Sequence, residues 1–240
     1  LCRRDVTSGH EPWRPGRTSP TNHTPAPPIE MPSFSTNCKR CPRLVAFLKQ
    51  VKKSHPDYYS KPVPAFGDDA AQLCIVGLAP GMHGANATGR PFTGDHAGIL
   101  LYETLYKYGF STKKQSAAGD DLALLNARIT NAVKCLPPQT KPVGDEVNTC
   151  NQWLQQELKS LPDNYVIIAL GAVAHKAVVK ALDLKQSDYK FGHGVEHKLS
   201  NGLLIDSYHC SRYNTQTKRL TTKMFEAIFK RAKTLLSKPA

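Results

Sequence analysis

No stretch of this 240-residue chain approaches the roughly 20 consecutive apolar residues that a membrane-spanning helix needs. The first thirty residues also lack the apolar core of a secretory signal peptide and are rich in Pro, Thr and Arg instead. Both absences argue against a membrane protein and against export, so we expect a cytoplasmic protein. The seven cysteines then lie in a reducing compartment, where metal or cluster ligation is expected rather than a disulfide framework.

Acidic residues are scarce relative to basic ones. The chain holds 19 Asp and Glu against 32 Lys and Arg, which gives a net charge of +13. A chain this basic often binds a polyanion such as nucleic acid. A merely basic surface explains the charge equally well, so charge alone leaves both interpretations open.

The N-terminal segment has almost no periodic apolar pattern. Residues 1–30 cannot bury enough apolar surface to offset the entropy of ordering, so we predict a disordered Pro-rich extension there and a folded domain over 31–240. Residue 31 is Met and residue 1 is Leu, which leaves two interpretations open. The segment is either an upstream extension of a chain that starts at Met31 or a basic tail on a fragment.

From Cys41 onward, short apolar runs alternate with stretches of helical periodicity. This alternation predicts an α/β fold with a parallel sheet that helices cover on both faces. Ligands of such sheets bind beyond the carboxyl ends of the strands, so the loops that follow the strands are the candidate sites. We expect helices near 44–51, 95–108, 147–161, 172–182 and 221–236, strands at 73–78, 128–133, 165–170 and 203–208, and a hairpin or irregular excursion at 189–199.

Four cysteines stand in positions that fit a metal centre. Cys38 and Cys41 form a C-x-x-C pair, and Cys135 and Cys150 flank a Pro-rich connection. Four thiolates select zinc or an iron–sulfur cluster, and the spacing does not separate the two. The remaining cysteines are Cys2 in the extension, Cys74 in a predicted strand of the core, and the ambiguous Cys210.

Two loops at strand ends, 77–95 and 209–221, are crowded with Gly, His, Asn, Arg and Thr. Neither is a P-loop or a dinucleotide-binding fingerprint, since Gly-Lys-Ser/Thr and G-x-G-x-x-G are both absent. Together with the cysteine set, their motifs resemble the uracil-DNA glycosylase superfamily, and most closely its family 5, the bacterial and archaeal type-B enzymes. The resemblance runs from about Met31 to Leu236 and rests on Gly77-Leu78-Ala79-Pro80, Gly89-Arg90-Pro91-Phe92-Thr93-Gly94-Asp95, Asn131, and His209 followed by Asn214-Thr215-Gln216-Thr217.

The resemblance implies a three-layer α/β/α sandwich with a four-stranded parallel central sheet. It also implies that Cys38, Cys41, Cys135 and Cys150 hold a structural [4Fe–4S] cluster, which separates iron from zinc by analogy. The implied activity is hydrolysis of the N-glycosidic bond of uracil, and of other deaminated bases, in DNA, which initiates base excision repair. The implied partner is double-stranded DNA, with single-stranded DNA as a further substrate form, bound by a monomer near the nucleoid of a prokaryote.

A glycosylase extrudes its target base from the stack and stabilises the negative charge that develops on the base as it leaves. Phe92 is the candidate stacking residue, with a core aromatic as the alternative. Asn131, at a strand end, presents an amide donor and acceptor to a base edge, or else caps a turn. His209, at the end of the last predicted strand, is the candidate for stabilising charge on O2 of the leaving base.

The group that positions the attacking water is the open point. Related families place Asp, Asn or Glu directly after the first strand, where this chain has Ala79. The resemblance therefore points to Asp95, although Asp95 fits a helix N-cap equally well. Gly77, Ala79 and His83 are assigned to the base pocket. No Lys occupies a motif position suited to a Schiff base, so we predict a monofunctional enzyme without lyase activity.

The loop after the last predicted strand is expected to contact DNA. Ser211-Arg212-Tyr213 is placed to fill the gap that an extruded base leaves, and Lys218 and Arg219 are placed to hold phosphates. A solvated basic loop is the alternative. The loop departs from the family pattern at Cys210, where Pro is usual, and at Lys218, where Gly is usual.

Two other functions stay open. One is a strict uracil glycosylase of the related iron–sulfur family 4, although Ala79 stands where that family has Glu. The other is a catalytically silent, metal-containing protein that binds nucleic acid.

Overall fold

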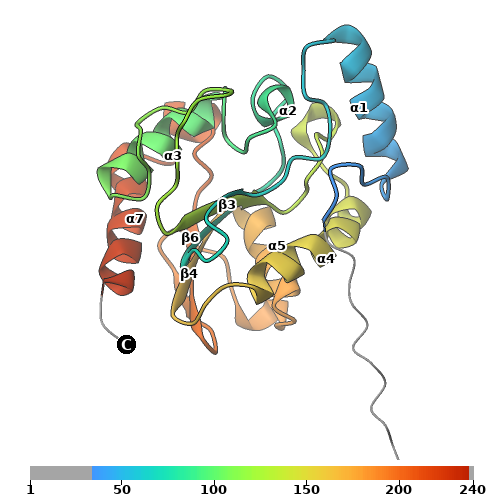
Figure 1. The fold of residues 1–240 in the computed structure, drawn as a ribbon. Coiled ribbons are helices and arrows are strands. Elements are labelled where there is room, and N and C mark those ends of the chain that lie inside the picture. The colour runs from blue at the N-terminus through green and yellow to red at the C-terminus, as the bar shows by residue number, and fades with distance from the viewer. Residues whose placement is uncertain (1–33, 238–240) are drawn as a thin grey trace, which may run out of the picture. The chain divides into compact units, whose positions relative to one another are not determined.

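The computed structural model of this chain describes residues 34–237 (Figure 1). The predicted disordered extension over 1–30 lies outside these residues, and the domain boundary at residue 31 stays a prediction. The described residues belong to one compact unit. None of the described helices combines the length and the apolar character that crossing a membrane requires.

A six-stranded sheet lies at the centre of the described chain, in the order β1-β3-β2-β4-β6-β5. Its four inner strands pair in parallel, and the two edge strands pair antiparallel with their neighbours. The sheet therefore has two more strands than the predicted four, because β1 and β5 have two and three residues, too few to leave an apolar pattern in the sequence. The strands are β1 (Phe66–Gly67), β2 (Leu73–Gly77), β3 (Ala127–Asn131), β4 (Tyr165–Leu170), β5 (Glu196–Lys198) and β6 (Gly202–Ser207).

The inner strands form where the sequence is apolar without interruption. Every residue of β2 and of β4 is buried, as expected for parallel strands that are covered on both faces. Alternate residues point to opposite faces of the sheet. Leu73 and Ile75 accordingly belong to one buried cluster, and Cys74 and Val76 to another. Cys74 is a core residue, as predicted.

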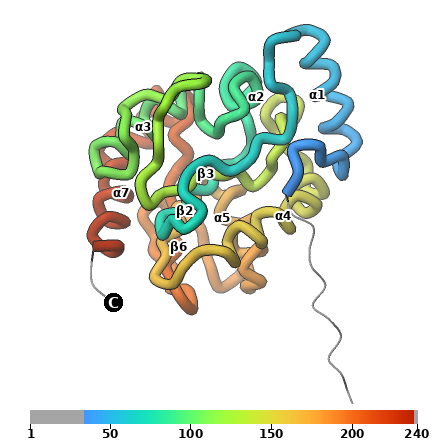
Figure 2. Tube along the Cα trace, viewed as in Figure 1, coloured from blue at the N-terminus to red at the C-terminus, as the bar shows by residue number. Residues whose placement is uncertain are grey.

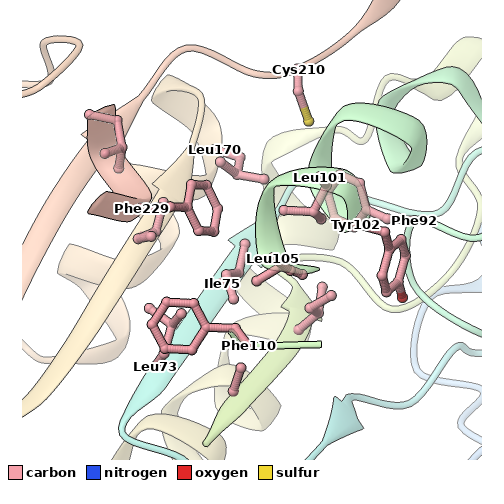
Figure 3. Close-up of a cluster of buried hydrophobic side chains, with 14 of the residues drawn as sticks. Leu73, Ile75, Phe92, Leu101, Tyr102, Leu105, Phe110, Leu170, Cys210 and Phe229 are labelled. Atoms are coloured by element: carbon pink, nitrogen blue, oxygen red, sulfur yellow. The ribbon is translucent and has the colours of Figure 1, made fainter. Parts of the chain in front are cut away.

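Two helices cover the face of the sheet that carries Ile75. They are α3 (His96–Lys107) and α7 (Thr222–Leu236), which lie together on one side of the strands (Figure 1). Leu101 of α3 and Phe229 of α7 meet Ile75 in the cluster of buried side chains drawn in Figure 3. This cluster packs α3 and α7 against the inner strands of the sheet.

Two other helices cover the opposite face. α4 (Gly144–Lys159) and α5 (Ala172–Ala181) pack on it through Leu154 and Val178, which are fully buried against Val76 and its neighbours. The prediction of a parallel sheet with helices on both faces is confirmed for the four inner strands.

The helix α1 (Pro42–Ser54) packs beside the sheet rather than on it (Figure 2). Its buried Leu44 joins Trp153 of α4 in a third cluster. Arg43 of α1 donates hydrogen bonds from Nε and Nη2 to the two carboxylate oxygens of Glu146, each at 2.8 Å. These contacts tie the start of α1, next to Cys38 and Cys41, to the start of α4, the helix that carries Cys150.

Four short elements were absent from the sequence prediction, because turns this short leave no periodic pattern. They are α2 (Ala85–Thr88), α6 (Arg212–Gln216) and the 3₁₀ turns Pro138–Thr140 and Gln186–Asp188. The first three follow β2, β6 and β3, at the carboxyl edge of the sheet.

Candidate active site

The carboxyl ends of the inner strands open into one pocket. β2 ends at Gly77, β3 ends at Asn131, and β6 ends at Ser207, shortly before His209. The pocket has a volume of about 310 Å³, within the usual range for small-ligand sites. Three of the loops that the sequence marked as candidate sites contribute to it. Its lining residues are Leu78, Ala79, Gly81, Ala85, Phe92, Asp95, Ala97, Asn131, Thr140, His209 and Ser211.

Gly77 lies directly against two of the pocket side chains. A Cβ added at this position would stand 2.4 Å from Oδ1 of Asn131 and 2.7 Å from the ring of Phe92. Real Cβ contacts are essentially never that short. Glycine at position 77 therefore lets both side chains lie on the backbone of β2 and form the floor of the pocket.

Phe92 belongs both to the core and to the pocket. Its side chain is 6% exposed and joins the cluster of Figure 3. Its φ of +54° is left-handed, which costs a non-glycine residue about 1 kcal/mol and persists only where the surroundings enforce it. Two neighbours enforce it here: the Tyr102 hydroxyl donates to the Pro91 carbonyl at 3.0 Å, and Gly98 leaves room for the Phe92 carbonyl.

His209 faces Phe92 across the pocket. The two rings stack, with 5.9 Å between their centroids. Burial lowers the pKa of His209 to about 4, so its imidazole is neutral at pH 7. The Asn214 side chain donates to the His209 carbonyl at 2.8 Å, which fixes the backbone there. A neutral imidazole in this place can donate one hydrogen bond without carrying a charge.

Asn131 has an unsatisfied acceptor. Its side chain is 3% exposed, and its Oδ1 has no hydrogen-bond partner among the described residues. A buried amide oxygen left in this way costs free energy, and most such atoms in proteins are paired. The pocket therefore presents an acceptor that a donor on a ligand would satisfy.

Asp95 fulfils the role of a helix cap and also faces the pocket. Its Oδ1 accepts a hydrogen bond from the backbone N–H of Gly98 at 2.9 Å, at the start of α3. Its Oδ2 lies against Gly81 and Gly84, where a Cβ at Gly84 would approach it to 2.6 Å. Burial raises the pKa of Asp95, while the backbone N–H groups at the start of α3 oppose the rise. Both interpretations of Asp95 are therefore compatible with the structure.

The residues after His209 spread outward from the pocket. Ser211 caps α6 and lines the pocket, while Arg212 lines a neighbouring hollow of about 450 Å³ beside α3. Tyr213 is 71% exposed. Lys218, at the position where the family usually has Gly, has a left-handed φ of +57°. Arg219 is exposed and lies over the ring of Tyr208, 4.7 Å from its centroid.

His83 is not brought into the pocket. The chain turns through α2 between His83 and Phe92, and the imidazole is exposed, with Nδ1 2.7 Å from the Tyr58 hydroxyl. Cys210, which the sequence left ambiguous, is fully buried in the cluster of Figure 3.

The four predicted cysteine ligands converge beside α1. Cys41 directly precedes α1, Cys38 lies three residues earlier, Cys135 follows β3, and Cys150 lies in α4. All four line one narrow hollow between α1 and α4. Burial raises the pKa of the Cys135 thiol, and the charges of the three other thiols raise it further. Four cysteines in one hollow would lose their protons together only if a cationic centre balanced their charge.

The spacing of the sulfurs bears on the kind of centre. A single zinc ion with four thiolates at about 2.3 Å holds the sulfurs about 3.8 Å apart. Within the described residues, no three of these sulfurs lie within 4.8 Å of one another. The backbone N–H of Lys134 donates to Sγ of Cys150 at 3.3 Å, a type of contact that iron–sulfur clusters commonly receive.

Comparison with known proteins places the chain in a family. A model of the uracil DNA glycosylase superfamily matches residues 64–233. The chain belongs to this superfamily. A type-5 uracil-DNA glycosylase of Thermus thermophilus is 45% identical over 207 residues, which cover 83% of this chain and 94% of that protein. A type-5 uracil-DNA glycosylase of Pyrobaculum aerophilum is 39% identical over 201 residues, or 82% and 88% of the two chains.

More distant relatives belong to another type. A type-4 uracil-DNA glycosylase of Archaeoglobus fulgidus is 30% identical over 150 residues, 62% of each chain. These matches confirm the resemblance that the motifs indicated. The alignments with the two type-5 proteins cover a larger share of this chain than the alignment with the type-4 protein does.

Sequence reasoning missed one polar wall of this glycosylase-family pocket. Thr140 lines it from the Pro-rich connection, where Gln139 and Thr140 both have left-handed φ values, +54° and +57°. These two successive residues turn the connection back over the strand ends. The only sequence signal was the Pro-rich composition of the connection, which marks a turn without giving its direction.

Proposed function

We propose that this member of the uracil-DNA glycosylase superfamily hydrolyses the N-glycosidic bond of uracil in DNA and so initiates base excision repair. The observation that carries the proposal is a pocket in which an aromatic ring, an unsatisfied amide acceptor and a neutral imidazole meet. The names of the type-5 relatives, which match most of the chain, support uracil as the substrate base.

Recognition of the base follows from the floor of the pocket. An extruded uracil lies against the ring of Phe92, and its N3–H donates to Oδ1 of Asn131, the acceptor that lacks a partner among the described residues. Cytosine has an unprotonated N3 and would leave that acceptor unsatisfied, so Asn131 also discriminates against the normal base.

Departure of the base requires a hydrogen-bond donor to the base, and a neutral imidazole can donate its N–H at pH 7 without first taking up a proton. As the C1′–N1 bond breaks, its electron pair moves onto the base and negative charge builds on O2. His209, neutral at pH 7, donates its ring N–H to O2 and stabilises that charge in a site shielded from water. The base takes up a proton after it has left.

The attacking water is held by Asp95. Its Oδ1 is occupied by the helix cap, and its Oδ2 accepts a hydrogen bond from the water, which adds to C1′ of the sugar. No lysine lines the pocket within the described chain, so no amine is available to form a Schiff base. The product is an abasic site with an intact strand.

Other deaminated bases are accepted as well, in this proposal. Ala79, Ala85 and Ala97 give the pocket small side chains where a larger residue would narrow it. Hypoxanthine and xanthine each carry a ring N–H beside a carbonyl, as uracil does, and so meet the same acceptor. A strict uracil enzyme is the alternative, and it predicts excision of uracil alone.

Cys38, Cys41, Cys135 and Cys150 would hold an iron–sulfur cluster. The cluster supplies a structural brace, since it would join α1 to the connection that carries Thr140 into the pocket. Cys135→Ala should lose iron, visible absorbance near 400 nm and stability, whereas Cys74→Ala, a buried cysteine outside the hollow, should keep its iron. Full iron content in Cys135→Ala would overturn the assignment.

DNA approaches the basic loop after β6. Ser211 to Tyr213 fill the space of the extruded base, with the exposed Tyr213 or Arg212 as the wedge, and Lys218 and Arg219 contact phosphates. The monomer acts on duplex DNA and on single strands alike, since extrusion costs nothing further in a strand already unpaired.

The test measures base release from oligonucleotides that carry one uracil, hypoxanthine or xanthine, followed by alkaline cleavage of the abasic product. Wild-type protein should excise uracil, and Asn131→Ala should lose about 10²-fold in kcat/KM. Asn148→Ala, an exposed amide on α4 that pairs with Lys180, should match wild type. Binding without release would favour the catalytically silent nucleic-acid-binding protein.

A further inference from the structure

A second cluster of side chains that could bind a metal lies outside the lining of the active-site pocket. It consists of His175 on α5, His197 on β5 and Asp206 on β6. Nδ1 of His175 is 2.7 Å from Oδ1 of Asp206, and Nε2 of His197 is 3.0 Å from Oδ2 of the same carboxylate. The three ligand atoms all lie within 4.8 Å of one another. The side chains are 1%, 9% and 0% exposed.

Both ring nitrogens of His175 face oxygen atoms that only accept hydrogen bonds, but a neutral imidazole has one N–H to donate. Its Nε2 lies 2.8 Å from the carbonyl of Tyr189, which only accepts, so Nε2 must carry a hydrogen. In the neutral imidazole, Nδ1 is then a bare lone pair. That lone pair points at Asp206, a carboxylate that also only accepts. A cation must therefore stand between the two, either an additional proton or a metal ion.

The surroundings match those of a metal-binding histidine. Such a histidine almost always donates its other ring N–H to a carbonyl or carboxylate, which fixes the tautomer, and the Tyr189 carbonyl accepts from His175 in this way. Two imidazole nitrogens and one carboxylate oxygen form a donor set typical of zinc and its neighbours in the first transition row. Three separate elements, α5, β5 and β6, supply the donors.

We propose that His175, His197 and Asp206 bind a divalent transition metal of the zinc class, at a site separate from the four-cysteine hollow. Tetrahedral ligands at about 2.0 Å lie about 3.3 Å apart. The two histidine nitrogens lie 2.7 and 3.0 Å from the carboxylate oxygens of Asp206, so the side chains would rearrange as the metal replaces the shared proton. The bound metal would join the excursion over 189–199, which contains β5, to β6. Because Asp206 lies just before His209 in the chain, the clamp would hold the backbone that presents His209. The proposal does not depend on the substrate of the active site.

The experiment uses the full chain with its cysteine centre loaded, stripped of loosely bound metal with a chelator and then titrated with Zn²⁺. We expect one equivalent of zinc to bind, with unchanged iron content, a higher melting temperature, and a zinc K-edge spectrum that shows nitrogen and oxygen ligands without sulfur. His197→Gln should weaken zinc binding by at least tenfold. His83→Gln, which removes an exposed imidazole, is the matched control and should bind zinc as wild type does.

Three results would overturn the proposal. The first is no zinc uptake by the folded wild-type chain, which would leave the additional proton on His175 as the cation. The second is a zinc spectrum with sulfur ligands or a matching loss of iron, which would place the zinc at the cysteines. The third is undiminished binding in His197→Gln. Because the first two use wild-type protein alone, they hold even if His197→Gln fails to fold.

Discussion

The ring of Phe92 stacks on the imidazole of His209, with 28° between the two planes. The two residues follow β2 and β6, which are separated in the sheet by β4, so their contact joins loops from either side of the central strand. The stack gives the imidazole an apolar neighbour on one face. That neighbour contributes to the burial that lowers the pKa of His209 to about 4.

Loss of the imidazole should reduce the chemical step far more than binding. In the proposed mechanism, His209→Ala removes a hydrogen bond that strengthens as charge develops on the leaving base, so kcat should fall by about 10²–10³-fold with little change in DNA affinity. Single-turnover kinetics on uracil opposite guanine measure the first quantity, and fluorescence anisotropy measures the second. Near-normal single-turnover rates would contradict the role given to His209.

The lowered pKa of His209 should also appear in the stability of the protein. The folded chain keeps His209 neutral down to about pH 4, whereas the unfolded chain protonates it near pH 6.5. Between these values the unfolded state binds more protons, so stability falls as the pH drops from about 6.5 toward 4. Urea unfolding of His209→Gln should show a shallower fall over that window. Parallel curves for the two proteins would contradict the shift.

The two roles of Asp95 can be separated by two substitutions. Asp95→Asn keeps an oxygen that accepts from Gly98 and still holds a water, so its rate should fall less than that of His209→Ala. Asp95→Ala loses the water contact and the helix cap together, so its rate should be lower still and its unfolding free energy about 1 kcal/mol smaller. An inactive Asp95→Asn beside an active His209→Ala would show that the two roles are reversed.

Gly77→Ala should damage the pocket while the fold survives. The added Cβ would displace Asn131 and Phe92, which it would otherwise meet at 2.4 and 2.7 Å, so we expect at least a tenfold loss of kcat/KM for uracil. Gly144→Ala is the matched control, because a Cβ there meets nothing within 4 Å and position 144 begins a helix. Equal activity of the two variants would show that the floor adjusts without cost.

Lys218 combines backbone strain with a charge. Lys218→Gly should relieve the left-handed strain and raise stability by up to about 1 kcal/mol, while DNA affinity weakens and the salt dependence of log K falls by about one unit. Lys218→Ala removes the same charge without relieving the strain. Its DNA affinity should therefore match that of Lys218→Gly, while its unfolding free energy should be lower than that of Lys218→Gly. An unchanged salt slope in both variants would show that Lys218 does not contact phosphate.

The inner sheet and the long helices could be predicted because buried parallel strands and amphipathic helices leave apolar patterns. β4 spans Tyr165–Leu170, the predicted residues, and α7 begins one residue after the expected start. The edge strand β1 could not be predicted, since its two residues gain their conformation from pairing with β3. Such pairing leaves no signal in its own residues.

The pocket shows the same limit. Asn131 and His209 were predicted from their positions at strand ends, Phe92 and Asp95 from the loop motif and the family resemblance, and the structure brings all four into one cavity. His83 was grouped with them because it shares the loop with Phe92, yet the turn at α2 directs it elsewhere. The sequence of a loop shows which residues it contains but does not determine the path of its backbone, so it does not show which side chains reach the pocket.

The packing at Gly77 restricts how the selectivity of this pocket could be redesigned. The floor admits no side chain at position 77, so variation there gives no graded change in the bases accepted. The walls differ, because Ala79, Ala85 and Ala97 each offer a methyl group that a larger residue can extend into the cavity. A mutant library confined to those three wall positions would narrow the cavity toward pyrimidines one methylene at a time, on an unaltered floor.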